Sequence, residues 1–397
     1  MSQGHSYLWV SLMLLVGFRL PAQVSHCLTV DQEPAVIQHL IQDATLIGSS
    51  SAATATATRA GKAIPLVFHV LHRTGEALIT EEKMDEQIEL LNAAFSARDR
   101  HLANLPIVFE PLVARPAAPI SFCLARRQTT AGWQSAIIRT EITDPAFDAT
   151  QDYWKPESGG SRPWAQDSFL NIWLITLNSS VTGFATYPDT VLTNHDGIVM
   201  HPRYLGFNDS AYGYGKVLVH EVGHYLGLAH IWGNCGSAGD GIADTPEQAS
   251  NYAGCPSEPQ FSCGSRDLVH NYMDYVDDDC MSMFTAGQYE QMKQVLEVLR
   301  PTLNRSLDCA KTPGKSPTNY LRCYPNPAHS VLHVEKINIE QHPFATIYAV
   351  DGRLFAKCPL VIGSEGSAIV AVDALPPGLY VVRIGQSVAK FIKSSGN

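Results

Sequence analysis

The chain has 397 residues and a formal net charge of −10, with 45% hydrophobic and 17% charged residues. This composition supports buried cores for two or three domains and excludes global disorder. The acidic balance argues against nucleic acid as a partner, because phosphate binding needs clustered Lys and Arg. No apolar run reaches the roughly 18 residues of a membrane span, so we expect no transmembrane segment.

The first residues have the pattern of a secretory signal peptide. Residues 7–18 (YLWVSLMLLVGF) are apolar and uncharged, and Ala22 follows as a small residue at a cleavage point. This pattern predicts a signal peptide over residues 1–22. The alternative is an N-terminal core helix, because the preceding residues carry no Lys or Arg. Export would make disulfides permissible.

Residues 23–58 do not have the composition of a core. They end in a run of small residues at 49–58 (SSSAATATAT), which cannot bury enough apolar area to order itself and is easily cut. We interpret residues 23–58 as a pro-segment that precedes a domain beginning at Arg59.

The pattern after Arg59 predicts an α+β domain over residues 59–309. Thr80 is expected to cap a helix, another helix is expected from about Lys216, and a Thr285/Gln288 capping box predicts a last helix that ends before Pro301. Strands are predicted at residues 64–71, 107–110, 120–124, 137–142, 170–175, 183–187 and 197–200. A helix, then strands, then a long helix is typical of a mixed sheet packed by helices.

The segment from 220 to 230 reads H-E-x-x-H-x-x-G-x-x-H. His220 and His224 stand one helical turn apart, so both imidazoles can reach one metal ion. Gly227 can take positive φ and turn the chain, which brings His230 round as the third ligand. Three imidazoles with one open position form a catalytic zinc site, and Glu221 lies beside them as a candidate base. The alternative is a helix with surface histidines near a structural Glu.

This motif resembles that of the metzincin metalloproteases, and within them the pappalysin family. The narrower likeness lies in three further segments: the N-Y-M-D-Y sequence at 271–275, G-D-G-I-A-D-T-P at 239–246 and C-M-S-M-F-T-A-G-Q at 280–288. The resemblance implies that Met273 forms a Met-turn beneath the metal. It also implies that Tyr275 can ligate the resting metal or donate a hydrogen bond to the tetrahedral intermediate. A packed aromatic residue is the alternative for Tyr275.

The resemblance also suggests how four cysteines are paired. Spacing alone allows three pairings, whereas the pappalysin pattern implies Cys235–Cys263 and Cys255–Cys280. The partners of four other cysteines, Cys123, Cys309, Cys323 and Cys358, remain unassigned.

Two regulatory or structural features are expected from the family. Asp240, Asp244 and Thr245 lie in a glycine-rich acidic loop whose oxygen ligands suit Ca²⁺, with an Asx-turn as the alternative. Cys27 is the only cysteine before Arg59, and a thiolate could take the open zinc position and keep the enzyme latent. The alternative is a cysteine with no role. The family's preference for Arg after the scissile bond predicts self-cleavage at Thr58–Arg59.

The C-terminal part is predicted to be a separate unit. Residues 310–322 read as an exposed linker, and short strands at 331–334, 345–350, 368–372 and 379–384 suggest a small antiparallel β-sandwich over residues 323–397. Y-P-N-P at 324–327, D-G-R at 351–353, L-P-P-G-L-Y at 375–380 and V-A-K-F-I-K at 388–393 resemble the sorting domain of type IX secretion. A carbohydrate-binding or purely structural sandwich is the alternative.

Together these features predict a secreted or surface-attached zinc endopeptidase. A zinc-bound water would attack the peptide bond, with Glu221 as general base and then general acid. The expected partners are protein or peptide substrates, with a preference for Arg or Lys just after the scissile bond, and the type IX secretion machinery. A monomer is expected. The competing hypothesis is a surface-displayed binding protein with a relic metal site, but Glu221 and all three histidines are present.

Overall fold

A computed structural model describes the chain as two compact units, residues 1–310 and 311–397. The expected signal peptide, the Thr58–Arg59 bond and most of the linker lie outside the described residues. The described residues are 25–27, 29, 34–48, 63–303, 309 and 321–394, without 77–78, 131, 145, 178–180, 190, 209, 234, 237–238, 336–343, 350–352, 363–366 and 385–386.

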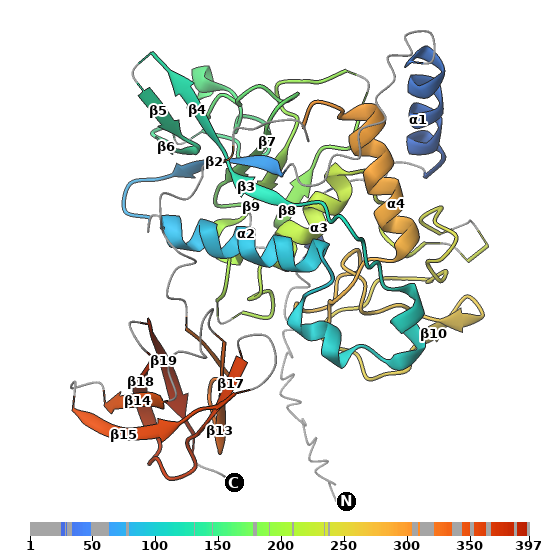
Figure 1. The fold of residues 1–397 in the computed structure, drawn as a ribbon. Helices are drawn as coiled ribbons and strands as arrows, with labels where there is room; N and C mark the ends of the chain where they lie inside the picture. The colour runs from blue at the N-terminus through green and yellow to red at the C-terminus, as the bar shows by residue number, and fades with distance from the viewer. Residues whose placement is uncertain are drawn as a thin grey trace, which may run out of the picture. The chain divides into compact units, whose positions relative to one another are not determined.

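The first unit is built on a seven-stranded mixed sheet, which confirms the predicted α+β class (Figure 1). The strand order is β1-β8-β9-β7-β2-β3, and β6 also pairs with β2. All described pairs in this sheet are parallel except β8 with β9. The strands are β1 (Ser25–Cys27), β2 (Ile64–His72), β3 (Phe122–Leu124), β6 (Ile137–Glu141), β7 (Leu170–Leu174), β8 (Val181–Ala185) and β9 (Ile198–Met200).

Helices cover the sheet and form the main core with it. Thr80 caps α2 (Glu81–Phe95) as predicted, and its hydroxyl accepts from the Lys83 amide. The Thr285/Gln288 capping box opens α4 (Ala286–Gln294), which continues as a π-helical turn, η6 (Val295–Leu299). The site helix α3 (Lys216–Tyr225) packs against β8 and β9 and is buried along its whole length. Helix α1 (Pro34–Gly48) packs on η6 and inserts Ile37 and Ile41 into the same core.

The strand predicted at residues 107–110 is wrong. These residues belong to a 3-10 helix, η3 (Ile107–Leu112), with Pro106 at its start and Pro111 inside it. Of this apolar run only Phe109 is buried, whereas Ile107 is 84% exposed. The prolines remove the backbone donors that a sheet ladder needs, so the apolar run has no strand partner.

The unit also contains several shorter elements. Other short 3-10 helices are η2 (Arg100–Asn104), η4 (Pro156–Ser158) and η5 (Pro202–Tyr204). Two small hairpins are β4 (Arg126–Thr129) with β5 (Gly132–Ser135) and β10 (Phe261–Ser262) with β11 (Ser265–Arg266).

Three disulfides connect distant parts of this unit. The structure forms Cys235–Cys263 and Cys255–Cys280, the two pairs that the resemblance implied. It also pairs Cys123 on β3 with Cys309, 186 residues away. Because a cross-link that closes a long loop restricts the unfolded chain most, this third disulfide is expected to stabilise the unit by a few kcal/mol.

A buried histidine joins the sheet to the loops before β7. The Nδ1 atom of His69 lies 2.7 Å from Ser161 Oγ, and its Nε2 atom lies 3.0 Å from Asn171 Oδ1. The imidazole also stacks on Trp173 with 5.0 Å between ring centroids. Burial is the main cause that lowers the pKa of His69 to about 4, so the ring is neutral at pH 7.

This histidine predicts a loss of stability in acid. The unfolded chain takes up the proton near pH 6.5, whereas folded His69 resists it until about pH 4. The free energy of unfolding should therefore fall by about 3 kcal/mol as pH drops through this window. Urea unfolding at pH 7 and pH 4.5 measures the loss, and His69→Gln should show a smaller difference between the two. An equal loss in the variant would assign the acid sensitivity to other groups.

The second unit is a small sandwich of two antiparallel four-stranded sheets. One sheet has the order β12-β13-β17-β16 and the other β15-β14-β18-β19, and inward side chains of both sheets form one core that includes Leu332 and Ile347. The strands are β12 (Arg322–Tyr324), β13 (Val331–Glu335), β14 (Phe344–Ala349), β15 (Leu354–Pro359), β16 (Val361–Ile362), β17 (Ser367–Ala371), β18 (Gly378–Ile384) and β19 (Ser387–Lys393). Cys323 and Cys358 are free thiols on β12 and β15.

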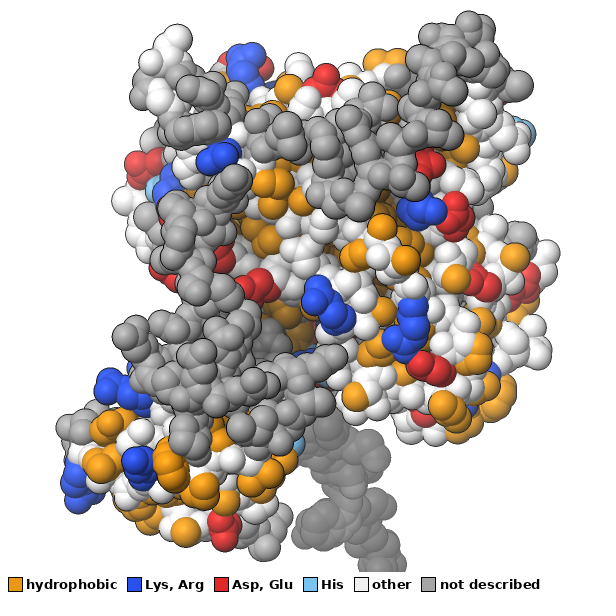
Figure 2. All heavy atoms as spheres, viewed as in Figure 1, with side chains coloured by type: hydrophobic (Ala, Val, Ile, Leu, Met, Phe, Trp, Pro, Cys, Tyr) orange, Lys and Arg blue, Asp and Glu red, His pale blue; other side chains and the backbone are white. Residues whose placement is uncertain are grey.

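Figure 2 shows how charged side chains are distributed on one face of the described surface. On the face in Figure 2, basic and acidic side chains are interspersed among apolar and polar ones, and neither sign forms an extended field over the described atoms. Among the described residues, no helix is long and apolar enough to span a bilayer.

Candidate active site

Helix α3 carries the first two histidines of the motif and ends where the third is needed. The helix closes at Tyr225, and the amides of Gly227 and Leu228 donate to the carbonyls of His224 and Gly223. Gly227 has φ +88°, a conformation that a side chain would strain, and an added Cβ would also press on Val295 and Ile37. The turn at Gly227 therefore reverses the chain tightly and returns His230 to the helix.

The three imidazoles converge as metal ligands do. His224 Nε2 lies 3.0 Å from His220 Nε2 and 3.1 Å from His230 Nε2. All three rings are buried, with at most 5% of each residue exposed. Three nitrogens at this spacing match three corners of a tetrahedron around Zn²⁺, for which Zn–N distances are about 2.0–2.1 Å. These residues therefore fit zinc.

Backbone carbonyls orient two of the histidines through the ring nitrogen that faces away from the metal position. His220 Nδ1 lies 2.7 Å from the carbonyl oxygen of Tyr272, and His224 Nδ1 lies 2.8 Å from that of Leu228. Protons held on Nδ1 leave both Nε2 lone pairs directed at the metal position. Burial, with the two neighbouring imidazoles, lowers the pKa of His224 far below its usual value and keeps this ligand neutral. The hydroxyl of Tyr187 also donates to the Leu228 carbonyl, a contact that the sequence did not suggest.

Met273 lies beneath this helix, at the position that the Met-turn resemblance implied. Met273 is fully buried, and its sulfur contacts the backbone face of Gly223 so closely that a Cβ there would collide with it. Asn271 holds the turn by accepting the Met273 amide at 2.9 Å and by bonding Gln288 on α4. The turn at Asn271–Met273 is thus joined to α4 by a side-chain hydrogen bond, which sequence spacing did not reveal.

Tyr275 lies beside the histidines within an aromatic cluster. Its ring centroid is 5.0 Å from that of His230 and 5.7 Å from that of His220. Trp232 stacks on His230 at 4.2 Å and meets Tyr275 edge-on at 4.6 Å. The Tyr275 hydroxyl donates to the carbonyl oxygen of Cys27 at 3.4 Å, so it already faces a peptide carbonyl next to the three ligands.

Glu221 is fully buried beside the metal position. Its Oε2 atom lies 3.3 Å from Thr29 Oγ1 and 3.5 Å from Cys27 Sγ, while Oε1 has no hydrogen-bond partner among the described residues. Burial raises the pKa of this carboxyl to about 8 in the structure as described. A carboxyl group with a raised pKa binds a proton strongly, and no described residue donates to Oε1 and competes for that position.

Residues from before Arg59 lie against the three histidines and Glu221. Strand β1 adds to the edge of the main sheet by pairing in parallel with β8, with Cys27 opposite Gly183. Cys27 is buried, and its sulfur and one ligand atom of each of the three histidines all lie within 4.8 Å of one another. The fold therefore brings the sequence-predicted cysteine to the zinc motif, although Cys27 and Glu221 are 194 residues apart in the chain.

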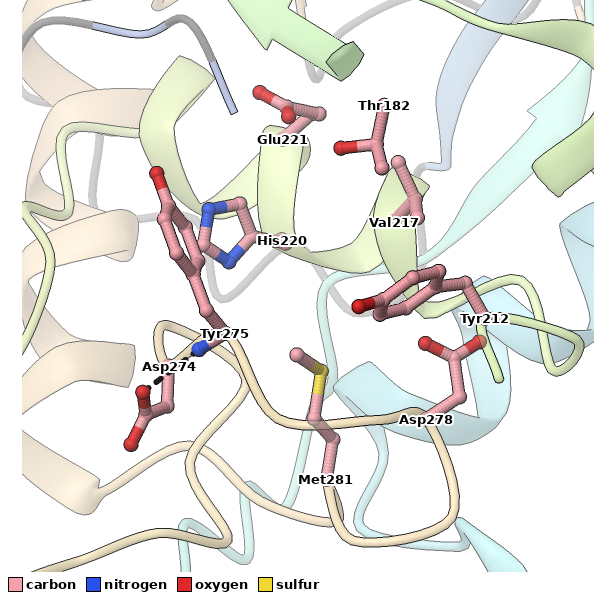
Figure 3. Close-up of a pocket in the computed structure, with 9 residues that line it drawn as sticks. All are labelled: Thr182, Tyr212, Val217, His220, Glu221, Asp274, Tyr275, Asp278 and Met281. Carbon is pink, nitrogen blue, oxygen red and sulfur yellow. Dashed lines mark hydrogen bonds between the residues drawn. The ribbon is translucent and has the colours of Figure 1, made fainter. Parts of the chain in front are cut away.

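A pocket opens next to Glu221 and His220 (Figure 3). Its lining residues border about 270 Å³ of space, part of which is open solvent, and in this view Glu221 and Asp278 lie on opposite sides of that space. Asp278 Oδ2 accepts the amides of Tyr214 and Lys216, but Oδ1 has no hydrogen-bond partner among the described residues. Burial raises the pKa of Asp278 to about 6, still below neutral pH. Sequence analysis missed this residue, although the acidic run 277–279 was a visible signal.

The acidic loop predicted to hold calcium packs against α4. Asp240 is 3% exposed, and burial raises its pKa to about 7. Asp244 Oδ2 accepts the Gly287 amide at 2.8 Å, and its Oδ1 has no hydrogen-bond partner among the described residues. A buried carboxylate oxygen without a donor, such as Asp244 Oδ1, suits a hard cation, whereas Asp240 already accepts from the Ile242 amide and Gln288.

Comparisons with known proteins agree with this geometry. Residues 160–297 match the family described as pregnancy-associated plasma protein-A, and residues 322–394 match the secretion system C-terminal sorting domain. An extracellular metalloprotease of Arthroderma otae is 39% identical over 143 residues, which cover 34% of this chain and 53% of that protein. One from Arthroderma benhamiae is 35% identical over 182 residues, 43% of this chain and 66% of that protein. This chain thus spans about half to two thirds of the length of these relatives.

Two solved structures from Tannerella forsythia share the fold. Mature mirolysin in complex with a cleaved peptide is 33% identical, with a TM-score of 0.57 over 62% of this chain and 97% of that chain. A promirolysin mutant is 30% identical, with a TM-score of 0.60 over 70% of this chain and 97% of that chain. The sorting-domain match indicates that the C-terminal unit is the signal for export by type IX secretion. With the three converging histidines and Met273 beneath them, these likenesses show that the chain belongs to the pappalysin family of zinc metalloproteases.

Proposed function

We propose that this chain is a secreted zinc endopeptidase made as a latent precursor, with residues 1–22 as signal peptide, 23–58 as pro-segment, 59–309 as catalytic domain and 323–397 as sorting domain. The observation that carries the activity is the convergence of His220, His224 and His230 at 3.0–3.1 Å beside the buried carboxylate of Glu221.

The chain's own residues have separate tasks in peptide hydrolysis. Zn²⁺ held by the three histidines would lower the pKa of a bound water and polarise the peptide carbonyl. Glu221 accepts the proton of the attacking water and delivers it to the leaving amine. Tyr275 donates a hydrogen bond from its hydroxyl to the carbonyl oxygen as negative charge develops there. Its hydrogen bond to the Cys27 carbonyl supports this role.

Asp278 supports the preference for a basic residue just after the scissile bond. The pocket borders Glu221, His220 and Tyr275 together, so a substrate side chain adjacent to the scissile bond can enter it. At its far end, Asp278 Oδ1 offers an unpaired acceptor held in place by two amides on Oδ2. A guanidinium or ammonium group would supply the missing donor and would add to the positive charge that the nearby Lys216 already presents to Asp278.

Removing metals should separate the two metal proposals. A zinc chelator is expected to abolish peptide hydrolysis, and added Zn²⁺ should restore it, because three imidazoles alone supply no electrophile. A calcium-selective chelator should instead lower the melting temperature, because the buried Oδ1 atom of Asp244, which has no donor among the described residues, would lose its cation. Activity that survives full loss of zinc would refute the enzyme assignment, and an unchanged melting temperature without Ca²⁺ would refute the calcium loop.

The pro-segment is proposed to keep the enzyme latent through Cys27. Its sulfur lies where a fourth zinc ligand would be, and β1 covers the edge of β8 to which an extended substrate could add. Both blocks disappear when residues before Arg59 are cut away.

Maturation should therefore begin with cleavage at Thr58–Arg59, which the enzyme performs itself. N-terminal sequencing of the mature protein is expected to start at Arg59, and a Cys27→Ala precursor should mature faster than wild type. A start elsewhere that is unchanged when Glu221 is disabled would point to another protease. Equal maturation rates for Cys27→Ala and wild type would show that the Cys27 thiol does not contribute to latency.

A further inference from the structure

Thr29 makes contacts in the cleft that differ in kind from those of Cys27. Its hydroxyl donates to Glu221 Oε2 at 3.3 Å and accepts the backbone amide of Ala185 at 2.9 Å. The residue is only 9% exposed. Its own amide lies 3.2 Å from Cys27 Sγ, so the two side chains are held together.

The contact with Ala185 extends the pairing of β1 with β8 by one more hydrogen bond, which a side chain accepts instead of the backbone. In the parallel register, Ser25 lies opposite Val181 and Cys27 opposite Gly183, and strand β1 then ends. The next amide along this edge of β8 with the same spacing is that of Ala185, and the Thr29 side chain supplies its acceptor. An unpaired amide at a buried strand edge costs free energy, so this hydroxyl replaces a missing backbone carbonyl.

The contact with Glu221 engages the proposed base itself. The carboxylate has two oxygens, and Thr29 and Cys27 both approach Oε2. A buried carboxyl oxygen that accepts a hydrogen bond from a hydroxyl is held in one orientation. It also has fewer lone pairs left to accept a hydrogen bond from a water molecule. Thr29 thus binds Glu221, which would accept the proton of the attacking water. It also binds the Ala185 amide, to which the backbone of an extended substrate would hydrogen-bond.

We propose that Thr29 is a second latch of the precursor, which holds Glu221 and the β8 edge independently of the bond between Cys27 and the metal. This inference rests on the latency proposed above and names a further residue for it. Because its contacts involve no metal, the latch holds in the zinc-free precursor and persists when the thiol is removed. Cys27→Ala alone should therefore release the pro-segment incompletely.

Three substitutions in the full-length precursor distinguish the contributions of the Thr29 hydroxyl, the Thr29 methyl group and the Cys27 thiol. Thr29→Val keeps the shape but removes the hydroxyl, Thr29→Ser keeps the hydroxyl but removes the methyl, and Cys27→Ala removes the thiol. In zinc-free protein, which does not cut itself, hydrogen exchange of the Ala185 amide should speed up about tenfold or more in Thr29→Val. It should remain slow in Thr29→Ser and in Cys27→Ala.

Maturation after zinc is restored gives the second readout. Thr29→Val should mature about tenfold faster than wild type, Thr29→Ser within about twofold of it, and Cys27→Ala/Thr29→Val faster than either single variant. Wild-type exchange and wild-type maturation in Thr29→Val would overturn the proposal, and so would a Thr29→Ser variant as impaired as Thr29→Val. If no precursor hydrolyses peptides even after its pro-segment is removed by an added protease, the proposed function fails, while the exchange data still decide the role of Thr29.

Discussion

Replacing Glu221 by Gln is expected to lower kcat by about 10²- to 10⁴-fold, because the amide cannot accept the proton of the attacking water. The variant should retain zinc, since His220, His224 and His230 are untouched and two of them are oriented by the carbonyls of Tyr272 and Leu228. Hydrolysis of a short peptide by the mature protein, measured with its zinc content, tests this expectation.

The size of the effect follows from the position of the carboxylate. Glu221 is fully buried, and its carboxyl lies close to Cys27, which is itself grouped with the three histidines. His230→Ala is a useful comparison, because it should lose zinc as well as activity. Near wild-type turnover in a zinc-loaded Glu221→Gln protein would show that another group moves the proton.

Replacing Asp278 by Asn is expected to remove the preference for Arg after the scissile bond, with kcat/KM for such peptides falling about 100-fold. The side-chain oxygen of Asn can still accept the Tyr214 and Lys216 amides, so the fold around the pocket should persist. Its amide nitrogen would replace the unpaired Oδ1 and would present a donor to the guanidinium. Peptides with Ala at that position should be cut at nearly unchanged rates.

The neighbouring residue offers a matched control. Asp277→Asn makes the same change in charge one residue away, but Asp277 does not line the pocket. It should leave the Arg preference intact, and both variants should be compared for melting temperature. If Asp278→Asn still prefers Arg over Ala by the wild-type ratio, the pocket does not select the basic residue.

Much of the zinc centre could be predicted from the sequence because its geometry is local. His220 and His224 meet through one turn of helix, and the return of His230 depends on a glycine that can adopt φ +88°. The capping box at Thr285 and Gln288 is likewise a short-range pattern, and the structure contains both of its hydrogen bonds. The resemblance to pappalysins, which the comparisons confirm, added Met273 and two disulfide pairs.

Other features depended on which segments the fold brings together. Asp278 lines the pocket because the chain after the Met-turn packs under the start of α3, where the Tyr214 and Lys216 amides hold one of its oxygens. Tyr187 reaches the Leu228 carbonyl from the far end of β8, and Thr29 reaches Glu221 from before the domain begins. No periodicity in the sequence encodes such contacts, since each joins residues at least 41 positions apart.

The sequence by itself therefore determined the α+β class and the sorting-domain resemblance, and it predicted the class of metal site with its three histidines and the proposed base. These properties follow from helical period, turn chemistry and short motifs, which act over a few residues. Tertiary structure alone decided that the apolar run at 107–110 is a helical turn, that Asp278 lines the pocket and that its Oδ1 atom has no hydrogen-bond partner among the described residues. It also decided that Cys27 and Thr29 lie in the cleft. Burial and partner choice set these outcomes, and both depend on how distant segments pack.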